Sequence, residues 1–493
     1  MNQKCTTWTA LAASIFAGGA LATNSQGQTS DTLLNALIKK GIITEQEAKD
    51  IKAEANKDSQ TQFNQSFTAK TGMASWINNY KLYGDFRGRF EENYADNAGY
   101  NARERYRYRL RLGLNVSMMD NLDIGLRLAS GNPQTKTGGA LVGGQSITAN
   151  QDLNSLETRK FIWIDAAYGK WTPIKNNDFT LSATIGKMDN PFQLSNMIWD
   201  YDINPEGGAL QAVYNINDQH ALKGIGGIYI LDEVKAGSLV TGSGTGSLTP
   251  TTIHAGHDPY VYGGQLLFES KWTPKIDTSL GVAAFNIVHK DSLSAFVQPS
   301  YNVGNTRTAN GFLTYSMNPI IGTASATYKL ATFPGYTGQF PIKLAGEYMD
   351  NPPAPSKQNK AWRAGVTFGK AGRKNTWEIA YRYQRLEADA WYDALVDDDN
   401  GAFYTAGTAG PGSSGNRALN SGLVNQANAA IPVGAWLGGT NVKGHQVVAT
   451  YSFTDSLNFT FIYYRNEAII NENVGIDKRS DVGHFMADLN WKF

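Results

Sequence analysis

Hydrophobic and polar side chains alternate along most of the chain from Tyr80 onward. In one such segment the apolar face carries every second residue, namely Leu122, Ile124, Leu126 and Leu128. Asp123 and Arg127 lie on the opposite face of the same segment. A period of two residues indicates a strand with one face in an apolar environment and the other in a polar one. Units of about ten such residues recur along the chain, so we predict a protein built from strands.

This recurring unit predicts about sixteen strands, a number within the range of outer-membrane barrels. We expect them to begin near Tyr80, Arg103, Asn121, Arg159, Asp178, Gly207, His220, Pro259, Ile276, Ile320, Phe340, Ala361, Lys374, Lys443, Ser456 and Asp481. The pattern leaves the fourth strand, the seventh strand and the stretch Arg307 to Met317 ambiguous.

The connections between these strands differ in length in a regular way. Those that follow even-numbered strands are short, as at Met119-Asp120, and those that follow odd-numbered strands are long, as at Ala388 to Val442. Transmembrane barrels have short periplasmic turns at one end and long loops at the other, whereas a soluble sandwich gives no reason for such alternation. We therefore predict an all-β fold, a transmembrane antiparallel β-barrel over residues 79–493.

The first residues have the pattern of an export signal. Lys4 precedes an apolar run from Ala10 to Ala22, which ends in the small-x-small sequence that a signal peptidase accepts. We expect residues 1–22 to be removed on export. Cys5, the one cysteine of the chain, lies in this segment, so the mature protein is expected to form no disulfide.

A short helical segment separates the signal from the barrel. Apolar residues recur at helical spacing from Ser30 to Ala55, and Thr44 with Glu47 forms a capping box for the second of two helices. A helical hairpin of this size buries little surface alone. We therefore expect residues 23–78 to form a periplasmic hairpin and polar linker that contacts another chain, the barrel rim or a periplasmic partner.

Composition narrows the class of protein further. Lys and Arg total 44 against 43 Asp and Glu, and the resulting net charge of +1 argues against a nucleic-acid binder. Charged residues make up only 18%, and 51 glycines favour strands and turns. The mature segment offers no run of about 18 apolar residues, which excludes a helical membrane protein.

The end of the sequence carries a family resemblance. In the last predicted strand Phe485, Leu489, Trp491 and Phe493 share one face. An amphipathic strand that ends in Phe resembles the closing strand of bacterial outer-membrane barrels, where it serves as the assembly signal. The short Leu-rich segment before the barrel, which ends in Lys40 to Ala48, resembles the segment that precedes the barrel in the putative porins and phosphate-selective porins. This resemblance implies a bacterial outer-membrane location, a homotrimer, and contacts with membrane lipid and lipopolysaccharide.

Arginines gather on the polar faces of the first three predicted strands. They are Arg87, Arg89, Arg105, Arg107, Arg109, Arg111 and Arg127. The face opposite the lipid lines a water-filled lumen, so we predict a basic wall that attracts anions and suits bidentate contact with phosphate or carboxylate. The alternatives are that these side chains pair with Asp85, Glu91 and Glu104, or that they form a solvated face.

The third long connection is unusually acidic and aromatic for an exposed loop. Its carboxylates are Asp189, Asp200, Asp202 and Glu206, and they lie beside Phe192, Ile198, Trp199 and Tyr201. Apolar side chains of a loop need burial, and folding inward against the barrel wall provides it. By resemblance to general porins, this loop would narrow the pore and face the arginines. The alternative is a loop packed on a neighbouring subunit.

Other chemistry is weakly indicated. His254, His257 and Asp258 lie in a Gly/Thr-rich loop, and the Asp397 to Asn400 segment lacks the Glu of a calcium loop, because position twelve is Thr408. No nucleophile elbow or phosphate-binding loop is present. We therefore expect no enzyme activity, no catalytic residue, no metal and no cofactor.

About sixteen strands leave an aqueous channel, whereas about eight would leave an interior filled by side chains. We predict a porin for passive diffusion of small hydrophilic solutes, constricted by the third long loop. An anion- or phosphate-selective channel is the first alternative, and a structural or adhesive barrel is the second.

Overall fold

The structure is a computed structural model that describes residues 74–95, 102–135, 141–233, 240–242, 248–250, 257–293, 302, 304–307, 312–404, 435–470 and 481–493. The chain divides into two compact units between Asn79 and Tyr80, and the second unit holds the barrel. The signal peptide and the helical hairpin predicted from the sequence lie outside the described residues.

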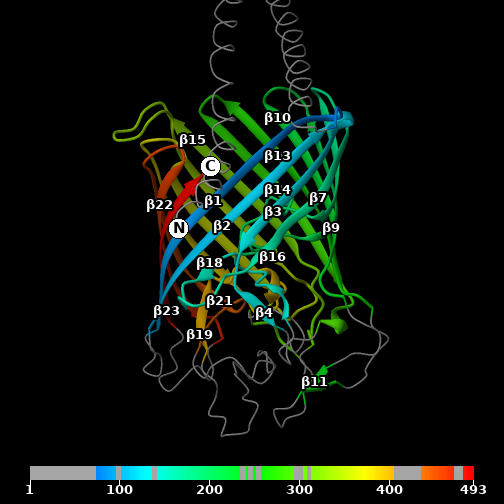
Figure 1. Ribbon diagram of the computed structural model, residues 1–493, viewed down its shortest axis with the longest axis vertical. Coiled ribbons are helices and arrows are strands. Elements are labelled where there is room, and N and C mark those ends of the chain that lie inside the picture. Colours follow the sequence, from blue (N-terminus) through cyan, green and yellow to red (C-terminus); the bar gives the residue numbers. More distant parts are fainter. Residues whose placement is uncertain are drawn as a thin grey trace, which may run out of the picture. The chain divides into compact units, whose positions relative to one another are not determined.

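Sixteen strands form a closed barrel (Figure 1). Each pairs with the next along the chain, and β23 returns to pair antiparallel with β1, with Trp491 opposite Phe86. The barrel strands are β1 (Ile77–Ala95), β2 (Arg103–Met118), β3 (Leu122–Ser130), β7 (Ile162–Lys175), β8 (Phe179–Lys187), β9 (Glu206–Asn215), β10 (His220–Ile230), β13 (Tyr260–Thr273), β14 (Ile276–Val288), β15 (Ile320–Leu330), β16 (Phe340–Asp350), β17 (Lys360–Gly369), β18 (Thr376–Leu386), β21 (Val442–Ser452), β22 (Leu457–Ala468) and β23 (Val482–Lys492).

The predicted all-β fold, the transmembrane-type barrel architecture and the count of sixteen are confirmed. Every strand begins within three residues of its predicted start. The ambiguous stretch Arg307 to Met317 is not a barrel strand, and its described residues contribute only an isolated bridge between Arg307 and Leu313.

The remaining elements are short and lie in the connections. Three two-stranded sheets are formed by β4 (Pro133–Thr135) with β5 (Leu141–Gly144), β11 (Val240–Gly242) with β12 (Leu248–Pro250), and β19 (Gly401–Tyr404) with β20 (Ala435–Gly438). The two-residue strand β6 (Gln151–Asp152) pairs with β2. Single 3-10 turns occupy η1 (Met119–Asn121), η2 (Lys290–Ser292) and η3 (Asp393–Leu395). Where the chain is described, no helix has the length and apolar character needed to cross a membrane.

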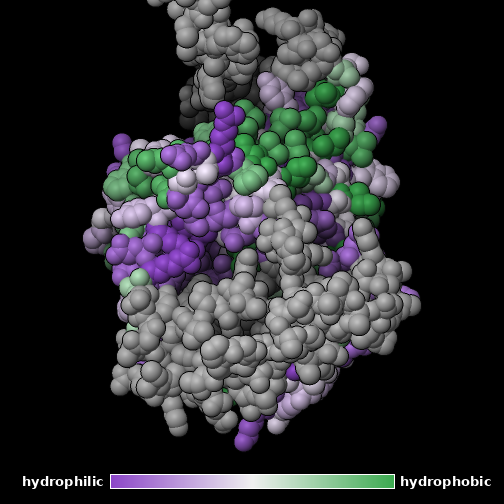
Figure 2. Space-filling model, turned by 60° about the horizontal axis from the view of Figure 1, so that its bottom comes forward, coloured by the Kyte–Doolittle hydropathy of each residue, from purple (hydrophilic) through white to green (hydrophobic). Residues whose placement is uncertain are grey.

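The outer face of the barrel is apolar. On β13, for example, the side chain of Leu266 is 64% exposed, whereas its neighbours Gln265 and Leu267 are buried on the inner face. Figure 2 shows hydrophobic residues gathered on the wall and hydrophilic residues between that band and the end that carries the long loops. An exposed apolar wall around a polar interior is the arrangement of a barrel surrounded by lipid.

Two long connections supply much of the buried core. They are the β8–β9 loop (residues 188–205) and the β18–β21 loop (residues 387–441, described to 404 and from 435). Their aromatic side chains pack against the inner faces of strands: Trp199 contacts Tyr229 of β10, with ring centroids 5.9 Å apart, and Trp391 contacts Phe285 of β14, with ring centroids 5.6 Å apart. The described parts of both loops that carry these side chains therefore pack against the inner face of the barrel.

Candidate functional site

The interior surface of β1, β2 and β3 brings together all seven arginines that the sequence singled out. Each has a carboxylate oxygen within 4.0 Å. The carboxylates in these pairs are Asp85, Glu91, Asp152, Asp165, Asp189, Asp202, Asp399 and Asp488. Seven guanidinium groups thus meet eight carboxylates, so this wall carries no excess of positive charge.

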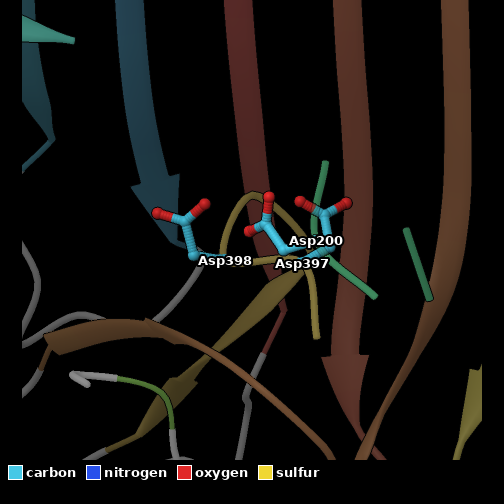
Figure 3. Close-up of side chains that lie close together, drawn as sticks. All are labelled: Asp200, Asp397 and Asp398. Atoms are coloured by element: carbon cyan, nitrogen blue, oxygen red, sulfur yellow. The ribbon is translucent and has the colours of Figure 1, made fainter. Parts of the chain in front are cut away.

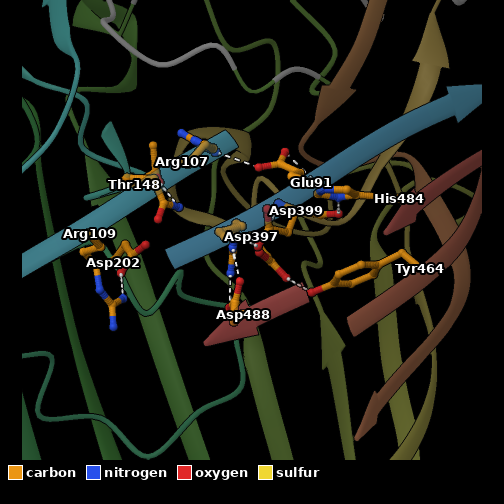
Figure 4. Close-up of polar contacts among 12 residues, drawn as sticks. Glu91, Arg107, Arg109, Thr148, Asp202, Asp397, Asp399, Tyr464, His484 and Asp488 are labelled. Atoms are coloured by element: carbon orange, nitrogen blue, oxygen red, sulfur yellow. Dashed lines mark hydrogen bonds and ion pairs between the residues drawn. The ribbon is translucent and has the colours of Figure 1, made fainter. Parts of the chain in front are cut away.

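The ion pairs at the centre of this wall are deeply buried. Figure 4 shows Glu91 in contact with Arg107 from β2. Arg89 donates to both carboxylate oxygens of Asp488, at 2.7 and 2.8 Å. Glu91 is fully buried and accepts from Arg105, from Arg107 at 3.0 Å and from His484 at 3.2 Å. Charged groups so far from water need partners of this kind, because a buried unpaired charge is costly.

The sequence left two interpretations of these arginines open. Pairing with Asp85 and Glu91, the first alternative, is present, although Glu104 takes part in no ion pair among the described residues. Contact with the third long loop is also present, through Asp189 and Asp202. Both features occur together, and most of the counter-charge comes from the strands themselves.

The β8–β9 loop crosses the barrel interior from this wall to the opposite one. At one side Asp189 pairs with Arg127 at 2.7 Å. At the other, the Ser195 backbone N–H and hydroxyl donate to the two carboxylate oxygens of Glu347 on β16, the first at 2.9 Å. The Gln193 backbone N–H likewise donates to Gln265 on β13 at 2.8 Å.

The four carboxylates predicted for this loop have different surroundings. Asp189 and Asp202 face arginines of the wall, the latter 3.8 Å from Arg109. Glu206, the first residue of β9, pairs instead with Lys187 at 2.8 Å and is exposed. Asp200 pairs with no cation among the described residues; it is buried against the β18–β21 loop.

Asp200 forms an acidic cluster with Asp397 and Asp398 (Figure 3). One oxygen from each lies within 4.8 Å of the others, the spacing that a cation could occupy. Burial, with the neighbouring carboxylates, raises the pKa of Asp397 to about 7 and the pKa values of Asp200 and Asp398 well above their ordinary range. The sequence had pointed to Asp200 and to the Asp397 segment separately, but not to their contact, because they are 197 positions apart. Thr408 and His254 lie outside the described residues.

The inner face of β17 and β18, which three strands separate from β1, holds a pair of arginines that the sequence analysis did not single out. Arg363 of β17 donates to Gln446 Oε1 at 2.9 Å, and Arg382 of β18 donates to the same oxygen at 3.0 Å. They line a cavity of about 560 Å³ next to the β8–β9 loop. In the β17–β18 register Arg363 and Arg382 are offset by two residues, so their side chains lie on the same face of the sheet. The cavity that both line identifies this face as the inner one.

Comparison with known proteins agrees with this architecture. Residues 97–311 match the family model described as "Putative porin". No curated protein matches the sequence. The family match, which covers less than half of the chain, agrees with the closed antiparallel barrel that the strand pairing shows.

Several solved porin structures are similar in fold at 11% sequence identity. OprB of Pseudomonas putida has a TM-score of 0.46 over 84% of this chain and 94% of its own. OmpF of Salmonella typhi, solved as a complex with daunomycin, has a TM-score of 0.40 over 84% of this chain and 97% of its own. OpdQ of Pseudomonas aeruginosa has a TM-score of 0.37 over 85% and 99%. Because these TM-scores are all below 0.5, the fold of this chain is assigned from its own strand pairing and not from its similarity to these structures.

Proposed function

We propose that this protein forms a water-filled channel through which small hydrophilic solutes diffuse passively. The observation that supports it best is the closed barrel of sixteen strands with charged side chains inside and apolar side chains outside. A barrel of this size leaves an aqueous passage, whereas one of about eight strands would be filled by its own side chains.

The β8–β9 loop is proposed to constrict this channel. It is anchored on both sides of the lumen, by Asp189 to Arg127 and by Ser195 to Glu347. Its apolar residues Met197 and Ile198 are fully buried, which supports a fixed position. The β18–β21 loop adds to the constriction, since Trp391 and Tyr392 are buried in the same interior.

The remaining sequence-based expectations extend this proposal. The short turns face the periplasm, the segment 23–78 contributes a periplasmic hairpin, and the barrel assembles as a homotrimer in contact with lipid and lipopolysaccharide. An adhesive or structural barrel would share the fold but not the open lumen. Conductance therefore separates the two functions.

Planar-bilayer recording of the purified full-length protein tests the channel directly. We expect discrete conductance steps in KCl, and a larger step when Ser195 and Glu347 are both replaced by Ala, because the loop then loses its anchor on β16. Folded protein that inserts without any steps would contradict the channel. Unchanged steps in the double variant would contradict the constriction.

A further inference from the structure

We infer that the inner wall formed by β16, β17 and β18 carries a binding site for small carboxylate anions, built from Arg363, Arg382 and Lys343. The inference rests on the proposed channel function and names a solute class for it. It places the anion-binding surface on β16, β17 and β18, whereas the sequence had indicated the arginines of β1, β2 and β3.

The first observation is the close approach of two like charges. Arg363 and Arg382 both donate to Gln446 Oε1, at 2.9 and 3.0 Å, so their guanidinium groups lie within about 6 Å of each other. A neutral amide oxygen offsets little of this repulsion. Neither arginine has a carboxylate within ion-pair distance among the described residues, in contrast to all seven of the β1–β3 wall.

Two nearby carboxylates are engaged elsewhere. Glu347 is opposite Arg363 in the β16–β17 register, but its two oxygens accept from Ser195. Asp397 is separated from Arg363 by Asn196, whose amide bonds to both. Glu378, four residues before Arg382 on β18, lines the adjoining cavity but forms no ion pair with either arginine among the described residues. An anion from solution can therefore supply the direct counter-charge that the arginine pair lacks.

The cavities in front of this wall also carry an excess of positive charge. The cavity next to the β8–β9 loop and an adjoining one of about 860 Å³ share Lys343 and Arg382. Their basic lining residues are Lys329, Lys343, Arg363, Lys370, Arg373 and Arg382. Their acidic lining residues are Glu269, Asp277, Glu347 and Glu378. Asp277 is already paired with Lys329, and Glu269 with Lys223 at 2.7 Å.

Lys343 completes the site. Its side chain is exposed to the cavity and takes part in no hydrogen bond or ion pair among the described residues. Planar guanidinium groups suit the two oxygens of a carboxylate, and an ammonium group adds a mobile point charge. Ser279, Thr323 and Thr367 line the same cavity and offer hydroxyls to a small organic acid.

Succinate block of the KCl current tests the site in the full-length protein. We expect succinate to reduce the wild-type conductance with saturation, and the half-blocking concentration to rise about tenfold in Arg382→Gln, the effect of losing one charge-assisted contact. Lys343→Gln should raise it as well, and Arg382→Lys, which keeps the charge, should raise it less. Arg109→Gln is the matched control, because Arg109 already has Asp85 as its counter-charge at 2.8 Å.

The outcomes separate the site from the channel. Equal block in wild type and Arg382→Gln, or an equal loss in Arg109→Gln, would overturn the site while leaving the channel intact. If no conductance steps appear, the channel proposal fails, and calorimetric titration of succinate into wild type and Arg382→Gln still decides the site. Inorganic phosphate that blocks at lower concentration than succinate would overturn the carboxylate class. Folding of each variant is checked by its heat-modifiable mobility on gels.

Discussion

The contact between the two inward loops should weaken as pH rises, and Asp397→Asn should reduce that response. The loops meet where the Asp200 N–H donates to the Leu395 carbonyl at 2.8 Å and the Asp397 N–H donates to the Asn196 carbonyl at 3.1 Å. The acidic cluster lies at this contact. Burial, then the charge of Asp399, raises the pKa of Asp397 to about 7. A carboxyl whose pKa is raised by folding contributes stability below its ordinary pKa and loses it as pH rises through the folded value.

The size of this effect can be compared with the bonds it opposes. A pKa that moves from 3.8 to about 7 corresponds to about 4 kcal/mol of folding free energy, lost between those two pH values. The pKa values of Asp200 and Asp398 are raised too, so their ionisation acts in the same direction. Each backbone hydrogen bond between the loops contributes about 1 kcal/mol. Ionisation therefore outweighs the two bonds at this contact, but not the continuous strand pairing of the barrel.

Single-channel recording between pH 5.5 and 8.5 measures the consequence. We expect current fluctuations of the wild-type channel to increase as pH rises from 5.5 toward 7, because loops that separate transiently change the width of the lumen. Asp397→Asn should show a smaller increase, since only Asp200 and Asp398 then ionise at this contact, and Glu206→Gln, which changes an exposed carboxylate paired with Lys187, should behave as wild type. Fluctuations that do not depend on pH, or that respond to pH as strongly in Asp397→Asn as in wild type, would refute the reasoning.

Three further predictions concern assembly and stability. Removing Phe493 should lower the yield of folded barrel, because its backbone exchanges two hydrogen bonds with Gly84, at 3.0 and 3.1 Å; equal yield would count against this. Arg107→Gln should lower the free energy of unfolding by about 1–3 kcal/mol, because it removes one counter-charge from the fully buried Glu91. The measurement is urea unfolding, and an unchanged midpoint would contradict this prediction. Deleting residues 30–55 should leave conductance unchanged, and a folded barrel that no longer conducts would place that segment in the pore.

The strands could be predicted because their signal is local. Alternation within about ten residues is enough to place a strand, and the starts of β7 and β10 were found even though their patterns were ambiguous. The arginine wall was also accessible, because its members lie on three consecutive strands. Only some of their ion pairs could be predicted from the sequence, because Arg89 pairs with Asp488, which lies in the last strand of the barrel.

The arginine pair of β17 and β18 was harder to predict from the sequence, for a physical reason. Arg363 and Arg382 are each the one arginine on the inner face of their strand, and only the β17–β18 and β18–β21 registers bring them to the same oxygen of Gln446. With the barrel assigned, the inward parity of each residue could have been read from the sequence. The meeting of Asp200 with Asp397 could not, because two loops that fold into a lumen are positioned by packing and not by periodicity.

The Arg89–Asp488 pair has a consequence for how the barrel closes. These two residues are 399 positions apart, and they face each other across the β1–β23 pairing that completes the sheet. If β23 slipped by one residue, its side chains would exchange faces, so Asp488 would point into lipid and Arg89 would lose its counter-charge. The pair therefore disfavours a β1–β23 seam in the wrong register, and the correct seam leaves neither edge strand open to pairing with other chains.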